Sequence, residues 1–187
     1  MRKNLLFILS VLVSLSVLAQ TPAWVTKMGS SNADLSYFSC AVDSSGNTYV
    51  TGTFSGTATF GSFSITSNGL KDNFLAKLDC GGTVAWVEKI GSVNDEGDWG
   101  SVTVDKNNNI YVTGSHSNSC TLYSSNASNQ TLSSTGGQDL YLAKYTTAGV
   151  LTWAINAGGG TGKENSFGVK TDNQNNVIIT GYYGYNG

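Results

Sequence analysis

The chain has 187 residues, of which 12% are charged, and its 10 basic and 12 acidic side chains give a formal net charge of −2. This balance leaves no basic surface and excludes binding to nucleic acid or to an anionic membrane as a main activity. Twenty-three glycines, a single proline and plentiful aromatic and β-branched residues predict an all-β, extracellular protein.

The N-terminal segment 1–19 has the composition of a secretory signal peptide. Arg2 and Lys3 precede an apolar run from Leu5 to Leu18, and Ala19 offers a small residue for cleavage. A membrane anchor is the competing interpretation, but the run is shorter than the roughly 20 apolar residues that span a bilayer. We therefore expect cleavage after Ala19, no membrane span afterwards, and a secreted or cell-surface protein. Loss of the two basic residues leaves 8 basic against 12 acidic side chains, a mature net charge near −4.

A pattern of three residues recurs three times after this segment. Tryptophan is followed 19 residues later by aspartate, and aspartate 9 residues later by glycine. The copies are Trp24, Asp43 and Gly52; Trp86, Asp105 and Gly114; and Trp153, Asp172 and Gly181. They lie 62 and then 67 residues apart. A fixed period of this kind is typical of proteins in which one supersecondary unit is stacked several times.

Each unit contains four stretches that we expect to be β-strands. They are residues 40–43, 48–52, 72–78 and 84–90 in one unit, and 102–105, 110–114, 139–145 and 151–157 in the next. Apolar residues or threonines alternate in them, and turns rich in Gly and Asn join the first two strands. The units differ in length mainly within segments 53–71 and 115–138, which we expect to be exposed loops. Residues 57–60 and 62–65 could form short extra strands there.

Four consecutive antiparallel strands per unit predict one blade of a β-propeller. The blocks AVDSSGNTYVTGTFSGTATFGS, DNFLAKLDCGGTVAWVEKIGS and TVDKNNNIYVTGS resemble the seven-bladed β-propeller (SBBP) repeats of secreted bacterial proteins. They are similar above all to the repeats of Bacteroidetes surface and gliding-associated proteins. The resemblance covers residues 23–187 and implies an all-β fold of four-stranded antiparallel blades. It implies no particular activity, because the members of this family are mostly uncharacterised.

The repeat region 20–187 divides into an N-terminal strand at 23–38, units at 39–91 and 100–158, and a partial unit at 167–187. This division corresponds to about two and a half blades. It starts on the fourth strand of one unit and stops after the second strand of another. We therefore expect an incomplete propeller with unpaired sheet edges, which favour association or aggregation.

One segment concentrates acidic side chains beside an aromatic residue. Asp95, Glu96, Asp98 and Trp99 are the candidate ligand-binding residues of the chain. A Ca²⁺ site or a platform for a sugar is one interpretation. A structural turn is the other, and it is favoured because the corresponding loops keep only one acid each and EF-hand spacing is absent. We expect no other cofactor.

The repeated aspartates and tryptophans have structural explanations. An aspartate before a tight turn accepts hydrogen bonds from backbone N–H groups, which explains its recurrence better than a ring of carboxylates around a channel. The tryptophans recur at one strand position, as core or inter-blade packing requires.

His116 is the only histidine, and its position among Ser and Asn favours an ordinary loop residue. Neither a zinc site nor a Ser-His-Asp arrangement can be built around it. Cys40 alternates with Val42 on an apolar strand face, so we expect a small buried side chain there. A Cys80–Cys120 bridge is the alternative use of the other two cysteines.

Regular repeats without a catalytic constellation predict an exported, non-catalytic module with a surface-binding, scaffold or adhesion role. A glycan or a surface protein is the expected partner. One alternative is the propeller portion of a larger secreted hydrolase. Another is a purely structural repeat in which segments 53–71 and 115–138 are merely solvated.

Overall fold

The computed structural model describes residues 24–29, 35–94, 96, 100–125, 127–160 and 162–184. Within these ranges the chain forms antiparallel β-strands and no helix, as the composition predicted. The described part accordingly contains no helix with the length and apolar character needed to cross a membrane. The signal peptide predicted for residues 1–19 lies outside the described residues.

Ten of the twelve strands in the described residues form two four-stranded meanders and a hairpin, which we call the first, second and third sheets. The first sheet has the order β1 (Leu35–Val42), β2 (Thr48–Phe54), β5 (Asp72–Leu78) and β6 (Val84–Gly91). The second consists of β7 (Ser101–Val104), β8 (Ile110–Leu122), β9 (Gln130–Tyr145) and β10 (Leu151–Ala157). The third is the hairpin of β11 (Glu164–Thr171) and β12 (Val177–Tyr183). The strands expected in each unit are therefore present.

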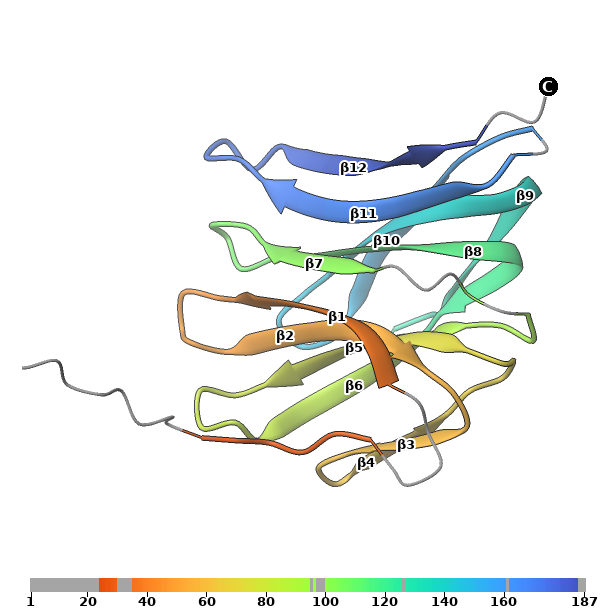
Figure 1. Ribbon diagram of the computed structural model, residues 1–187. Helices are drawn as coiled ribbons and strands as arrows, with labels where there is room; N and C mark the ends of the chain where they lie inside the picture. Colours follow the sequence, from red (N-terminus) through yellow and green to blue (C-terminus); the bar gives the residue numbers. More distant parts are fainter. Residues whose placement is uncertain are drawn as a thin grey trace, which may run out of the picture.

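The sheets stack on one another through their first strands. β7 contacts β1 on one side and β11 on the other, and Figure 1 shows the three leading hairpins one above another. Two residue pairs, Ile90 with Leu122 and Gly91 with Thr121, also join β6 to β8. This edge contact merges the two meanders into one eight-stranded hydrogen-bonded sheet.

Left-handed residues close the turns between the first two strands of each unit. Gly46, Asn108 and Asn175 occupy the same position in the repeat, with φ of 81°, 60° and 64°. Glycine has no Cβ to oppose this conformation, and asparagine tolerates it better than other residues. The Gly and Asn residues of these turns thus have the role that the sequence predicted.

The segments of variable length are strands that contribute to the core. In the first unit β3 (Thr57–Phe60) and β4 (Phe63–Thr66) form a separate hairpin, close to the extra strands expected there. In the second unit the same region lengthens β8 and β9 instead. The expectation of exposed loops was wrong, because these segments bury Ala58, Phe60, Cys120, Leu122 and Leu132. The same burial contradicts the alternative in which both segments are merely solvated.

Apolar side chains fill the space between successive sheets. Leu75 and Ile90 of the first sheet pack with Val102 and Val112 of the second in the largest cluster. A smaller cluster around Val169 joins the second sheet to the third. On the remaining face of the first sheet, side chains of β2, β5 and β6 are covered by the β3–β4 hairpin and by residues 24–29.

Cys40 is exposed, contrary to expectation, and so is Val42 on the same face of β1. The alternation along the strand was interpreted correctly, but that face has no sheet packed on it. At the corresponding positions of β7 and β11, Val102 and Val169 are buried because a preceding sheet covers them. Cys80 is exposed and Cys120 is buried, and both are free thiols.

Candidate functional site

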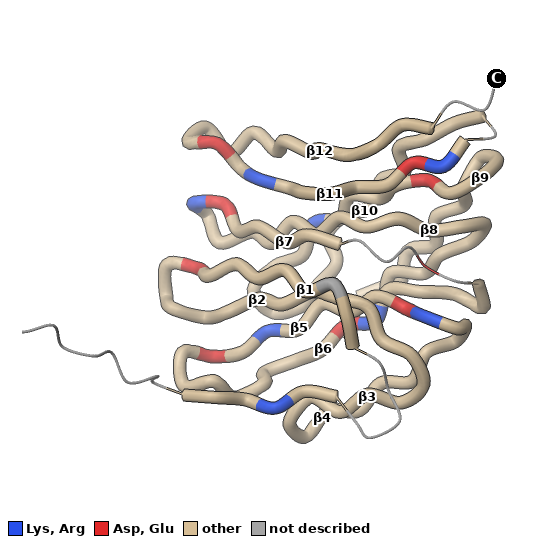
Figure 2. The backbone as a smooth tube through the Cα atoms, in the orientation of Figure 1, with Lys and Arg blue, Asp and Glu red and all other residues tan. Residues whose placement is uncertain are grey.

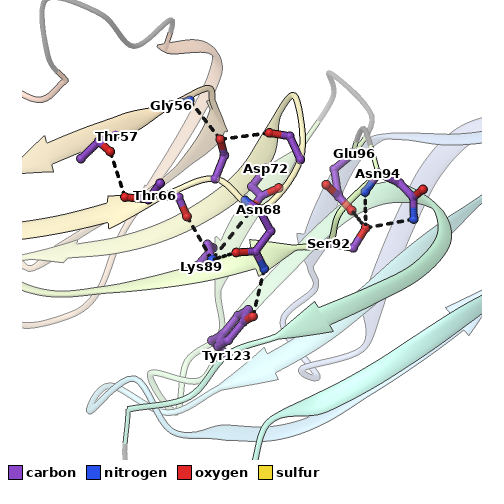
Figure 3. A network of polar contacts seen from close by, with 12 residues as sticks. Gly56, Thr57, Thr66, Asn68, Asp72, Lys89, Ser92, Asn94, Glu96 and Tyr123 are labelled. Atoms are coloured by element: carbon purple, nitrogen blue, oxygen red, sulfur yellow. Dashed lines mark hydrogen bonds and ion pairs between the residues drawn. The ribbon is translucent and has the colours of Figure 1, made fainter.

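Two buried carboxyl groups meet where the first sheet joins the second. Asp72, at the start of β5, is fully buried and accepts a hydrogen bond from the Asn68 backbone N–H at 2.9 Å (Figure 3). The Lys89 ammonium lies 4.0 Å from its carboxylate. Gly91 makes room for this side chain, since a Cβ at that position would lie 2.2 Å from Asp72 Cγ.

Glu96 is the second member of this acid pair. Its backbone N–H donates to the Lys71 carbonyl at 3.1 Å, and the Ser92 hydroxyl donates to its Oε1 at 2.7 Å. The side chain is 1% exposed. Asp72 Oδ1 and Glu96 Oε2 have no hydrogen-bond donor. The acid pair is therefore buried and incompletely satisfied.

Burial and mutual repulsion keep a proton on this acid pair. Burial raises the pKa of Glu96 to about 8, the Ser92 hydrogen bond opposes this rise, and the nearby Asp72 charge adds to it. Burial also raises the pKa of Asp72, against the opposing effects of the Asn68 N–H and Lys89. Two carboxyl groups this close do not both ionise readily, so Glu96 holds a proton at neutral pH.

Of the four residues predicted to bind a ligand, Asp95, Asp98 and Trp99 lie outside the described residues. The structure places Glu96 beside Asp72, a neighbour that sequence reasoning missed. A signal was present, because an aspartate opens the third strand of both complete units. Within the described ranges, no group of three or more His, Cys, Asp or Glu side chains could hold a metal ion.

Asp139 occupies the position of Asp72 in the second unit and belongs to a different network. Its Oδ2 accepts hydrogen bonds from the Thr135 N–H at 3.0 Å and from Asn156 Nδ2 at 2.7 Å. Asn156 Oδ1 lies 2.7 Å from His116 Nε2. His116 is fully buried within β8, so the expectation of a loop residue was wrong. The long second-unit hairpin places this histidine inside a strand.

The repeated turn aspartates accept hydrogen bonds from the backbone, as predicted. The N–H groups of Ser45 and Asn47 donate to Asp43 Oδ1 at 2.9 Å, and the Tyr49 hydroxyl donates to Oδ2 at 3.0 Å. Burial opposes ionisation of Asp43, but these hydrogen bonds outweigh it and lower the pKa. Backbone N–H groups at the same positions donate to Asp105 and to Asp172. Figure 2 shows acidic positions at the tips of all three leading hairpins.

The repeated tryptophans pack between units. Trp24 lies against Gly82 in the first sheet, and Trp86 lies against Gly149 in the second. The Trp86 indole N–H donates to the Thr147 carbonyl at 3.2 Å. The prediction of core or inter-unit packing is confirmed for both side chains.

A cavity of about 470 Å³ opens between the second and third sheets. Its walls are Leu140, Ala157 and Gly158 from the second sheet, and Glu164, Ile179, Gly181, Tyr182 and Tyr183 from the third. Glu164 is buried and neither of its carboxylate oxygens has a hydrogen-bond partner. The cavity combines apolar walls with one carboxyl group, the usual character of a binding pocket.

Comparison with known proteins gives one informative match. The chain is 33% identical over 129 residues to an uncharacterized WD repeat-containing protein of Acanthamoeba polyphaga mimivirus. The match covers 64% of this chain and 9% of the viral protein's length. It is a distant, partial homology that points to a repeat of the β-propeller type. No protein-family model matches the chain, so membership of the SBBP family stays a prediction.

Proposed function

We propose that this chain is an exported β-propeller repeat module of the SBBP kind, with a non-catalytic binding or scaffold role at the cell surface. The observation that carries the proposal is the repetition of the same interlocking contacts at successive junctions. Trp24 on Gly82 recurs as Trp86 on Gly149. Repeat proteins stack through nearest-neighbour interfaces of this kind.

A second set of inter-unit contacts supports the same conclusion. Asn108 Oδ1 accepts hydrogen bonds from the Ser44 N–H at 3.3 Å and the Ser44 hydroxyl at 3.1 Å. One unit further, Asn175 Oδ1 accepts from the Lys106 N–H at 3.3 Å. The left-handed residue of each of these turns thus binds the turn of the preceding unit. These hydrogen bonds hold each turn to the turn of the preceding unit, as a scaffold of stacked units requires. They also occupy the recurring asparagine side chains of the turns, so these polar groups have a structural role.

The alternative function, a portion of a secreted hydrolase, has one specific observation in its favour. Glu96, whose pKa is raised to about 8, keeps a proton near neutral pH beside a second carboxyl group, as a general acid requires. However, both side chains are buried. Asp72 accepts a hydrogen bond from the Asn68 N–H, and Glu96 accepts one from the Ser92 hydroxyl. A substrate would need access that this burial denies, so we favour a structural role for the acid pair.

Binding to glycans and to cell surfaces tests the proposal directly. Residues 20–187 would be applied to a glycan array and to intact bacterial cells. Asp95→Asn, Asp98→Asn and Trp99→Ala should weaken binding if the segment contacts the partner. Val93→Ala is the matched control, because Val93 is exposed just before that segment. Replacement of whole segments is unsuitable, since residues 53–71 and 115–138 carry core side chains.

The outcomes separate the candidate functions. Binding that Val93→Ala retains and the three variants lose supports a surface-binding module. Absence of binding to every glycan and surface refutes it, and turnover of a glycan or peptide library supports the hydrolase alternative. N-terminal sequencing of the secreted product tests export, with cleavage after Ala19 as the expected result.

A further inference from the structure

An amine, a primary amide and a carboxyl group meet at one point beside β6. The Lys89 ammonium donates a hydrogen bond to Asn68 Oδ1 at 2.6 Å, and its Nζ lies 4.0 Å from Asp72 Oδ2. Figure 3 shows the Lys89 and Asn68 side chains pointing toward each other next to Asp72. The three groups are a nucleophile, an acyl group with a nitrogen that can leave, and a base. Together they are what the exchange of one amide for another requires.

The amide carbon lies within reach of the amine. A C=O bond is about 1.2 Å long, so Asn68 Cγ lies within about 4 Å of Lys89 Nζ. Reacting atoms about 3–3.5 Å apart are close to attack, so a small rotation of the lysine side chain suffices. The Lys89 side chain is 16% exposed, and its Nζ lies 4.9 Å from the centre of the Tyr123 ring. The amine is therefore confined beside the amide.

Hydrogen bonds also hold the amide in one orientation. Asn68 Nδ2 donates to the Tyr123 hydroxyl at 3.1 Å, and the Asn68 backbone N–H donates to Asp72 Oδ2 at 2.9 Å. The nitrogen that would leave thus lies beside Tyr123, while the carbonyl oxygen lies beside Lys89. Asn68 is exposed, so ammonia released from it can reach the solvent.

The second unit has the same hydrogen-bonded framework without the reactive pair. Asp139 accepts a hydrogen bond from the Thr135 N–H at 3.0 Å, the contact that Asp72 makes in the first unit. Asn156 stands in place of Lys89, and a threonine stands in place of the asparagine. The Asn156 amide donates directly to Asp139 at 2.7 Å. Hydrogen bonds alone therefore complete this part of a unit, so packing does not explain why the first unit has an amine and an amide here.

We propose that Lys89 and Asn68 form an isopeptide bond, an autocatalytic cross-link between β6 and the segment that joins β4 to β5. Asp72 in its carboxylate form takes a proton from the Lys89 ammonium, and the free amine attacks Asn68 Cγ. The Nζ–Cγ bond forms, a second Nζ proton passes to Nδ2, and the Cγ–Nδ2 bond breaks. Ammonia leaves and takes the proton from Asp72, so the products are a secondary amide and an ammonium ion.

The acid pair supplies the base for this reaction. Burial raises the pKa of Asp72, and the Asn68 N–H and the Lys89 charge oppose this rise. A carboxylate with a raised pKa is a stronger proton acceptor than one in water. Glu96, with a pKa of about 8, keeps its own proton at neutral pH, which leaves Asp72 to accept the proton of the amine. The inference does not depend on surface binding, so the two proposals can fail separately.

Mass spectrometry of the purified chain tests the cross-link. We expect an intact mass lower than that of the sequence by one ammonia molecule. Trypsin should no longer cleave after Lys89, and the digest should contain a branched peptide that joins Lys89 to Asn68. Lys89→Arg and Asn68→Ala should each restore the full mass and the two separate peptides.

Lys77→Arg is the matched control and should leave the cross-link intact. The Lys77 ammonium also donates to a carbonyl and lies over a tyrosine ring, those of Thr147 and Tyr49. That carbonyl belongs to the backbone, however, so its nitrogen cannot leave as ammonia.

Asp72→Asn tests the base. Asparagine has nearly the same shape but cannot take a proton from the amine, so the cross-linked fraction at a fixed time after synthesis should fall at least about tenfold. Circular dichroism checks that the variant folds. A folded variant that cross-links as fast as the unmodified chain would remove Asp72 from the mechanism. If the variant does not fold, the unmodified chain and Lys89→Arg still decide the proposal.

Two results would overturn the proposal. One is an unmodified chain that keeps its full mass after prolonged incubation. The other is loss of ammonia that persists in Lys89→Arg, because the Gly69 backbone nitrogen would then have attacked Asn68 to form a succinimide. That route yields aspartate or isoaspartate at position 68 and no branched peptide. A hydrogen bond between the Gly69 backbone and Asp72 opposes it.

Discussion

The indole ring of Trp86 lies against Gly149, the residue with φ of +80° in the turn between β9 and β10. A Cβ at Gly149 would lie 3.1 Å from Trp86 Cδ2. The same relationship holds one unit earlier, where a Cβ at Gly82 would lie 2.4 Å from Trp24 Cδ2. Each tryptophan therefore needs a glycine in the following unit, both for space and for backbone conformation.

Gly149→Ala should destabilise the fold by about 1–3 kcal/mol, because alanine opposes the left-handed conformation and its methyl group displaces the indole. Urea unfolding followed by tryptophan fluorescence measures the effect. Gly46→Asn is the control and should change stability by less than about 0.5 kcal/mol. Gly46 has a similar φ, but a Cβ there would make only an ordinary van der Waals contact, 3.5 Å from Cys80 Cβ, and asparagine occupies its position in the other two units. Equal loss in both variants would show that the indole contact is unimportant.

The turn aspartates should make the fold sensitive to acid. Their hydrogen bonds lower the pKa of Asp43, Asp105 and Asp172. A lowered pKa contributes stability above the unfolded value near 4, and that stability is lost as the pH falls through the folded pKa. Chemical denaturation between pH 6 and pH 3 should show a decline that Asp105→Asn reduces. An unchanged decline would assign acid sensitivity to other groups.

Asp105→Ala should cost about 2–3 kcal/mol at pH 7, because two backbone N–H groups and the Tyr111 hydroxyl lose their acceptor. Asp105→Asn keeps an acceptor oxygen and should cost less. Urea unfolding of both variants measures the difference. A loss of equal size in both would mean that the charge, rather than the acceptor, stabilises the turn.

Glu96 should make stability fall with rising pH. Its pKa is raised to about 8 in the folded protein, against about 4.3 in the unfolded chain. Between these values the folded state holds an extra proton, so stability falls as the pH rises through the folded pKa and then levels off. Relative to Glu96→Gln, the unmodified chain should lose at least about 1 kcal/mol between pH 5 and pH 8. Asp172→Asn is the control, and its curve should run parallel to that of the unmodified chain over this range.

Hydrogen bonding defines the tautomer of His116. Asn156 Nδ2 donates to Asp139 and to the Ser133 carbonyl, so its Oδ1 must accept from His116 Nε2. We expect ¹⁵N NMR to find a proton on Nε2 of His116. Asn156→Ala should destabilise the fold by about 2–4 kcal/mol by leaving buried polar groups without partners. An Nε2 without a proton would contradict the assigned network.

The cysteines should differ in reactivity. Cys40 and Cys80 are exposed and Cys120 is buried. Burial also raises the pKa of Cys120 well above its usual value, which suppresses the reactive thiolate. A thiol reagent should therefore label two cysteines in the folded protein and a third only after denaturation. Labelling of Cys120 under native conditions would contradict its burial.

Local features of the structure could be predicted because they depend on neighbouring residues. Asp43 and Gly46 define a turn through contacts only a few residues apart, and the alternating apolar positions of β2 define a strand. The strict spacing of Trp, Asp and Gly also indicated that these elements repeat. Strand order within each complete unit followed from the same pattern.

The tertiary structure decides which face of a strand is buried. It also decides which acidic side chains come into contact. Cys40 and Val102 hold the same position in the repeat, yet only Val102 has a sheet packed on it. Asp72 and Glu96 come together because one opens β5 and the other follows β6, a pairing that no local pattern records. The sequence by itself determined the repeated strands and turns, since short-range hydrogen bonds and side-chain alternation encode them. Only the stacking of sheets decided which side chains are buried and brought Asp72 together with Glu96, because these features arise from contacts between distant parts of the chain.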